Sequence, residues 1–452
     1  MHRNRTWQID PTELRSQRNR ILPIEGGDGS TLSLDFTAMG GVIDPRITFS
    51  RVDANARATF FNSSGIVTTV ASAQAPRFDF DPTTLVAKGL LLEAPATNTV
   101  THSGDFTQNS AGNWSGRTGL ITTGSPPWTN FSSPDGGTAA VKLIADTPST
   151  RHSIENNAPS ITSGTTYTAS AFVKASGYTV ANLTVAGGQA RRNFTLSGAG
   201  SVGSSFGVTN TATINAVGSD GWYRITMTWT ATASGATGVW VAIPQNATTD
   251  SVTSWAGNGT SGIFAWGAQL EVGTQASSYI ATTTGSVTRA VDTAIIAAGT
   301  NFSSWYKGGT TGTFVANWHG SASSATSRTV IATSDVDDKH LHLQQTASAL
   351  TLRLADFGAL ATVTTANNLT ANTLTKGAFS YSGTAASLCL NGGTVATGTL
   401  GFSVAPTFLS IGGPSTTGTT ITDTSVMLKN SIRTIKYFPT SLSNVQLQAL
   451  TS

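Results

Sequence analysis

The sequence predicts an all-β fold built mainly from antiparallel β-sandwiches. One observation is strict alternation along single segments: Tyr223, Ile225, Met227 and Trp229 are separated by polar residues, as in a strand with one buried face. Another is that such segments recur between Gly-, Ser- and Asn-rich turns. Composition agrees, because only 11% of the 452 residues are charged while 38% are hydrophobic, enough for several cores.

The order of these segments predicts four parts. We expect an N-terminal arm at 1–30, a small β-rich module at 31–100, and two antiparallel β-sandwich (jelly-roll) domains at 101–295 and 296–452.

The first 30 residues predict a basic attachment arm. Asp10 as N-cap, Pro11 at the first helical position and Glu13 at capping-box spacing predict a short helix over 11–20. The alternative is a solvated tail, whereas our hypothesis is a segment that orders on docking to another protein. The residues expected to make this attachment are Arg3, Arg5, Arg15, Arg18 and Arg20.

The distribution of charge limits the partners. Residues 1–20 of the arm hold five arginines and two carboxylates and so carry +3, equal to the net charge of the whole chain, which leaves the remaining 432 residues neutral on balance. A neutral body does not favour binding to nucleic acid or to a membrane surface. No run approaches the roughly 20 apolar residues of a membrane span. We expect neither nucleic-acid binding nor membrane insertion.

Cys389 is the single cysteine, so neither an intramolecular disulfide nor a thiolate metal cluster can form. The N-terminus lacks the apolar stretch of a secretory signal. A composition typical of extracellular modules, without disulfides or an export signal, favours a protein that leaves the cell as part of an assembled particle. We expect no cofactor.

Residues 34–98 hold a succession of short motifs: DPRITFSR, a turn at 62–65, RFDFDP and GLLLEAPATN. This succession resembles a module that recurs in virion proteins of tailed bacteriophages. The resemblance implies a virion structural protein (a tail fibre, tail spike, head fibre or capsid decoration) whose partners are capsid, portal or tail proteins, and it says little about chemistry. It is carried by Asp44, Pro45, Arg46, Phe49, Arg51, Pro76, Arg77, Phe78, Asp79, Gly89, Leu90, Leu91, Glu93 and Asn98.

The segment at 101–295 repeats the alternation in TYTASAFV, where Tyr167, Ala169, Ala171 and Val173 share one face. With SGDFTQNSAGNW, DGWYRITMTWTAT and FAWGAQLEVG, this segment resembles carbohydrate-binding modules of the jelly-roll kind. The resemblance implies glycans as ligands.

The segment at 296–452 predicts a second sandwich. We expect a hairpin at 340–356, another at 387–398 turning on Asn391-Gly392, and a last helix capped by Ser443 and Gln446. With its closing strand and helix, the segment resembles concanavalin and laminin-G domains. Some sandwiches of that kind bind calcium, and the sequence leaves this open.

Three motifs that could indicate catalysis or metal binding are better explained structurally. Gly198–Gly203 matches G-x-G-x-x-G, but no helix follows it to bind a pyrophosphate. His340 and His342 share one side of a strand near acidic residues, without a third ligand placed by the sequence. The carboxylates Glu93, Glu155 and Glu271 show no spacing that nominates a glycosidase pair. We therefore expect no enzymatic activity.

Tryptophans supply the candidate glycan site, because sugar faces stack on aromatic rings. Trp222 and Trp266 lie in expected strands and should be core residues. Trp128 and Trp255 lie in turn-rich loops, where sandwich binding sites are built, so these two are the expected glycan-binding residues. Packing between chains is the competing explanation.

Together these expectations describe a virion appendage that attaches by its N-terminus and binds host-surface or environmental glycans, as a homo-oligomer such as a trimer. A purely structural capsid or tail component is the alternative, and a polysaccharide depolymerase is a weaker one. The sequence distinguishes neither head from tail attachment nor one glycan from another.

Overall fold

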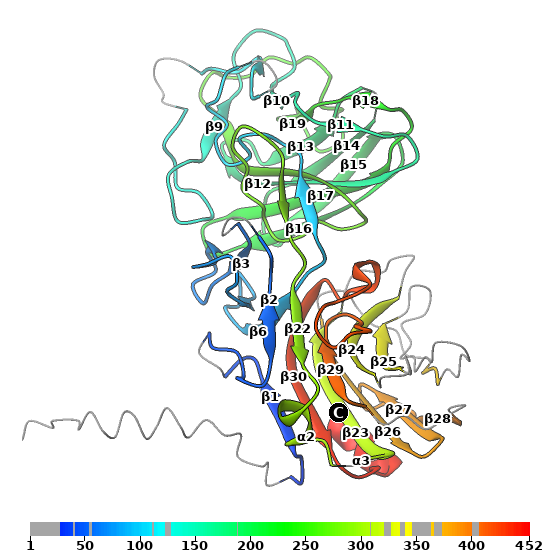
Figure 1. Cartoon of the computed structure of the whole chain (residues 1–452). Helices are drawn as coiled ribbons and strands as arrows, with labels where there is room; N and C mark the ends of the chain where they lie inside the picture. Colours follow the sequence, from blue (N-terminus) through cyan, green and yellow to red (C-terminus); the bar gives the residue numbers. More distant parts are fainter. Residues whose placement is uncertain are drawn as a thin grey trace, which may run out of the picture.

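The computed structural model describes residues 28–38, 41–53, 57–110, 113–122, 128–187, 189–307, 309–320, 327–334, 340–345, 363–365, 373–399 and 406–452. Strands in antiparallel sheets dominate these residues, which confirms the all-β prediction. They form a central sandwich, at the top of Figure 1, and a C-terminal sandwich below it.

The central sandwich has two large sheets. One has the order β15 (Ser201–Gly207), β14 (Ala190–Thr195), β13 (Val180–Val185), β19 (Val239–Ala242), β10 (Ser153–Asn156) and β8 (Gly116–Thr118). The other has the order β16 (Asn210–Val217), β17 (Trp222–Thr230), β12 (Thr166–Ser176), β20 (Gly262–Val272) and β9 (Val141–Ile144). A short pair, β11 (Ser160–Ile161) with β18 (Gly235–Ala236), lies beside them.

The alternation in β12 and β17 determines which face is buried. Tyr223, Ile225, Met227 and Trp229 all lie in the core between the sheets, as do the alternate residues of β12 from Tyr167 to Val173. Both alternation predictions are confirmed. Trp222 and Trp266 are also buried, in a smaller cluster with Phe172 and Tyr279, as predicted.

The C-terminal sandwich also has two large sheets. An eight-stranded sheet has the order β28 (Ala396–Thr399), β27 (Ala385–Leu390), β26 (Leu374–Ser382), β23 (Thr311–His319), β30 (Asn430–Phe438), β6 (Ala87–Leu92) and β5 (Arg77–Phe80), with β1 (Leu32–Asp35) also on β30. The facing sheet has the order β2 (Thr48–Ser50), β22 (Thr293–Ile296), β29 (Phe408–Ile411), β24 (Arg328–Ser334) and β25 (His340–Gln345). Short helices α2 (Thr300–Ser303), η1 (Thr424–Val426) and α3 (Asn444–Thr451) complete it.

The segment at 31–100 is not a separate unit in this structure. Its strands β1, β2, β5 and β6 join the two sheets of the C-terminal sandwich. Phe78, Leu90 and Leu92 lie in the same core as Trp318, which a few short strands alone could not bury. The remaining strands form the hairpin β3 (Thr59–Phe61) with β4 (Val67–Thr69), and β7 (Ala96–Asn98), which pairs with β21 (Val287–Arg289).

Gly89 shows how closely this segment is integrated. Its φ is +103°, and a Cβ built on it would lie 2.1 Å from the carbonyl oxygen of Ile432 in β30. Any other residue would therefore push β6 away from its neighbour.

The local predictions for the C-terminal sandwich have separate outcomes. The capping box of Ser443 and Gln446 is present, and Asn391 and Gly392 have the expected positive φ between β27 and β28. The first strand expected at 340–356 is present as β25, and it pairs with β24. Residues 346–356 lie outside the described residues, as does the helix expected over 11–20.

Candidate functional site: a cleft between the sandwiches

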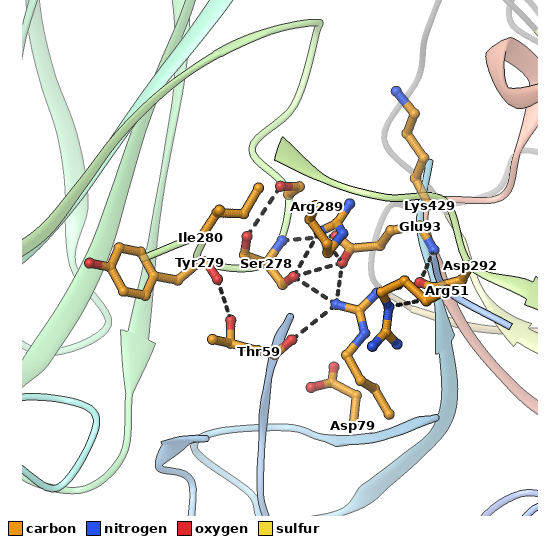
Figure 2. A network of polar contacts seen from close by, with 12 residues as sticks. Arg51, Thr59, Asp79, Glu93, Ser278, Tyr279, Ile280, Arg289, Asp292 and Lys429 are labelled. Carbon is orange, nitrogen blue, oxygen red and sulfur yellow. Dashed lines mark hydrogen bonds and ion pairs between the residues drawn. The ribbon is translucent and has the colours of Figure 1, made fainter. Parts of the chain in front are cut away.

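A buried network of ion pairs, defined as Arg51, Arg77, Glu93, Arg289 and Asp292, lies where the C-terminal sandwich meets the segment that leaves the central one (Figure 2). Arg77 contacts both carboxylates, at 2.6 Å from Glu93 and in a close pair with Asp292. Arg51 lies 2.7 Å from Asp292, and Arg289 lies 2.7 Å from Glu93. All three arginine side chains are fully buried.

The network is completed by Ser278, in the segment that leaves the central sandwich. Its backbone N–H and its hydroxyl both donate to Glu93, at 2.8 and 2.7 Å. Burial alone would raise the pKa of Glu93, but Arg289 and Arg77 hold that pKa well below its usual range. Glu93 therefore stays ionised, accepts hydrogen bonds from Ser278 and has no proton to donate as a general acid.

Several residues that carry the virion-module resemblance belong to this junction. Arg51, Arg77 and Glu93 form ion pairs of the network. The Asn98 amide donates to the carbonyl oxygens of Ala268 and Ile280, so it connects β7 to the central sandwich. These polar residues therefore stabilise the connection between the two sandwiches.

Beside the network lies a cleft of about 940 Å³, which we call the inter-sandwich cleft. One wall is the outer face of β16 and β17, where alternate residues form the cross-strand pairs Thr211–Thr228, Thr213–Thr226 and Asn215–Arg224. The hydroxyls of Thr213 and Thr226 lie 2.7 Å apart. This wall therefore presents a ladder of hydroxyl and amide groups.

The opposite wall belongs to the eight-stranded sheet and carries the cations Lys88, Lys429 and Arg433. Lys88 lies 3.1 Å from Asp79. His319 also lines this wall. Its pKa is lowered to about 4, mainly by burial and to a smaller extent by the nearby positive charges of Lys88 and Arg433. His319 is therefore neutral near pH 7 and adds no charge to the wall.

The two tryptophans expected to bind glycan have different environments. Trp255 is only 8% exposed, and its indole N–H donates to the carbonyl oxygen of Ile243 at 3.2 Å. Its ring packs edge-on against His152 and Tyr178. The geometry gives Trp255 a packing role, because turn-rich sequence does not reveal that a loop folds back over the core.

Trp128 is half-buried at the edge of the central core, and the Arg117 guanidinium lies 4.6 Å from its ring centroid. Neither tryptophan lines the inter-sandwich cleft. Sugar stacking on Trp128 stays a prediction. The arginines Arg3, Arg5, Arg15, Arg18 and Arg20 lie outside the described residues.

The glycine motif and the glutamates considered as catalytic candidates hold positions that serve the fold. Residues 198–200 of the glycine motif form the expected turn, whereas residues 201–203 are already part of strand β15, so no helix follows the glycines. Glu155 accepts hydrogen bonds from Arg151 and Ser153, while buried Glu271 accepts them from Gln269 and Ser277. Within the described ranges, no group of three or more His, Cys, Asp or Glu side chains is placed to hold a metal ion.

No helix in the described part of the chain is long and apolar enough to cross a bilayer. The sequence alone did not nominate Lys88, Lys429 or Arg433 as site residues. Their common wall exists because β6 pairs with β30 from the other end of the chain, and no local motif encodes that pairing.

The sequence matches no protein-family model and no curated protein. Solved structures with similar folds include the CBM40 module of the Ruminococcus gnavus IT-sialidase, at 19% identity over 34% of this chain and 88% of that chain, with a TM-score of 0.28. The SAP-like pentraxin of Limulus polyphemus has 11% identity over 32% and 70%, with a TM-score of 0.24. The LG1-3 region of the laminin α2 chain has 11% identity over 67% and 66%, with a TM-score of 0.24. At these identities the likeness concerns the β-sandwich fold alone.

Proposed function

We propose that this protein is a structural component of a tailed-phage virion, an appendage that binds glycans with its β-sandwiches. The virion part is supported by the motifs at 34–98 and by a composition low in charge, with one cysteine. The glycan part is supported by one observation, the inter-sandwich cleft with its ladder of threonine hydroxyls. Its volume suits an oligosaccharide, and hydroxyl groups both donate to and accept from sugars.

The attachment proposal concerns the basic arm. Its five arginines would dock on a capsid, portal or tail protein, and the appendage would be a homo-oligomer such as a trimer. Deleting residues 1–30 should leave both sandwiches folded and remove the protein from assembled particles. Normal incorporation of the truncated protein would contradict this role of the arm.

A glycan array with the purified protein tests the binding proposal. Thr213→Val with Thr226→Val removes a hydroxyl pair from the cleft wall and should reduce the array signals by about tenfold, the equivalent of about 1.4 kcal/mol. The matched control is Thr166→Val with Thr230→Val, a cross-strand pair between β12 and β17 at 3.0 Å that does not line the cleft. Absence of any glycan signal, or equal losses in both variants, would contradict binding in the cleft.

The second candidate function is a purely structural capsid or tail component. The buried ion-pair network favours it, because a stiff junction between the sandwiches suits packing in an assembled particle. An array without hits, together with loss of particle stability in network variants, would support this alternative.

A further inference from the structure

We propose that the inter-sandwich cleft selects an acidic saccharide, whose anionic groups are bound by Lys429 and Arg433. The inference rests on the proposed glycan-binding function and adds the class of sugar. Irregularities in the backbone place the cations on this wall.

Two β-bulges lie in the neighbouring strands β6 and β30. Asp79 pairs with Gly89 and Phe80 with Ala87, so Lys88 is the extra residue of the first bulge. Asn317 pairs with Thr434 and Trp318 with Ile432, so Arg433 is the extra residue of the second. Bulges change the direction of a side chain and are frequent beside functional sites. Both bulges therefore bring a cation to the cleft.

Lys429 is positioned by a third irregularity. It directly precedes β30 and has a φ of 55°, in the left-handed region that lysine seldom adopts. The pKa of its ammonium group is lowered, mainly by burial and to a smaller extent by the nearby positive charge of Arg328. Figure 2 shows its side chain extending away from Glu93 and Asp292. A partly desolvated cation in this position gains stability when an anion binds beside it.

The carboxylates of the cleft are already engaged. Asp79 pairs with Lys88 and also accepts the backbone N–H of Phe61. Asp81 accepts the backbone N–H groups of Thr83 and Thr84. Glu93 is bound by two arginines of the network.

The charges of Lys429 and Arg433 are not engaged in this way. Within the part of the chain that the structure describes, neither side chain has a hydrogen-bond or ion-pair partner. These two cations are therefore free to bind an anionic ligand.

The wall formed by β16 and β17 favours a sugar over a simple polyanion as the ligand. Threonine hydroxyls cover that wall, and its one cation, Arg224, donates to Ser170 at 3.2 Å and stacks over Phe172. A nucleic-acid surface would need many phosphate-binding cations, whereas two free cations facing hydroxyls suit a carbohydrate that carries spaced acidic groups.

The test compares matched saccharides by titration calorimetry on the full chain. Oligogalacturonate carries carboxylates, and its methyl-esterified form is the same sugar without charge. We expect the charged form to bind at least about tenfold more tightly, with weaker binding as salt is raised. Oligosaccharides of a sulfated galactan, which carry sulfate and no carboxylate, test whether sulfate replaces carboxylate, and polyglutamate tests whether a polyanion without sugar suffices.

The variants Lys429→Gln and Arg433→Gln should each weaken oligogalacturonate binding by about tenfold. Lys436→Gln is the control, because Lys436 lies on β30 with Arg433, carries the same charge, pairs with Asp28 and does not line the cleft. Equal weakening by all three variants would mean a general charge effect and would overturn the inference.

The remaining outcomes separate this inference from the proposed function. If the esterified sugar binds as well as the charged one, the acidic selectivity is wrong while glycan binding stands. If polyglutamate binds as well as the sugars, the site recognises polyanions and both proposals fail. If no sugar binds and the threonine variants change nothing, glycan binding itself is wrong.

Discussion

Two groups of charged residues lie side by side between the sandwiches, and they differ in how their charges are neutralised. In the ion-pair network, every charge has an oppositely charged partner and the arginine side chains are fully buried. On the cleft wall, Lys429 and Arg433 are half-buried and carry no such partner in the described residues. Satisfied charges stabilise a junction, whereas unsatisfied charges beside a cavity are available to a ligand.

The largest expected effect is in the network. Glu93→Gln removes the negative charge shared by Arg77 and Arg289, so two buried guanidinium groups lose a counter-charge. Breaking a buried pair in this way costs about 3–5 kcal/mol in free energy of unfolding, measurable by urea denaturation. The control, Asp220→Asn, breaks the exposed pair with Lys174 and should cost under about 1 kcal/mol. Similar losses in the two variants would mean that the network does not stabilise the junction.

The next comparison concerns the two tryptophans. Trp255→Ala removes a ring that is 8% exposed and packed against His152, and it should cost about 3 kcal/mol or more. Trp128→Ala removes a half-buried ring and should cost about 1 kcal/mol, with any loss of glycan signal pointing to sugar stacking. If Trp255→Ala left the stability unchanged and abolished glycan binding, the packing role of Trp255 would be wrong.

The smallest expected effect on stability is on the cleft wall. Lys429→Gln and Arg433→Gln remove cations that form no ion pair among the described residues, so thermal unfolding should show changes within about 0.5 kcal/mol. A loss of stability above about 1.5 kcal/mol would mean that these cations stabilise the fold, as the charges of the network do. The measurement also shows that the variants used for binding are folded.

Much of the local structure follows from local sequence. Alternation along β17 predicted its buried face, and Ser443 with Gln446 predicted the start of α3. The Asn391-Gly392 turn was also predictable, because few residues other than Asn and Gly adopt positive φ readily.

The site was less predictable, for two reasons. Sequence suggested loop tryptophans, but a loop residue can fold back over a core, as Trp255 does. Lys88 and Arg433 are placed by bulges, and a bulge is a mismatch between two strands that neither strand encodes alone.

The sequence by itself determined the all-β class, the buried faces of the long strands, and the turn and cap residues, because these depend on neighbours within a few positions. Only the tertiary structure decided that strands β1, β5 and β6 belong to the C-terminal sandwich and that Arg77 meets Asp292. Those partners are far apart in the chain, and their pairing depends on which sheet edge and which core can bury them. The inter-sandwich cleft is a consequence of that pairing.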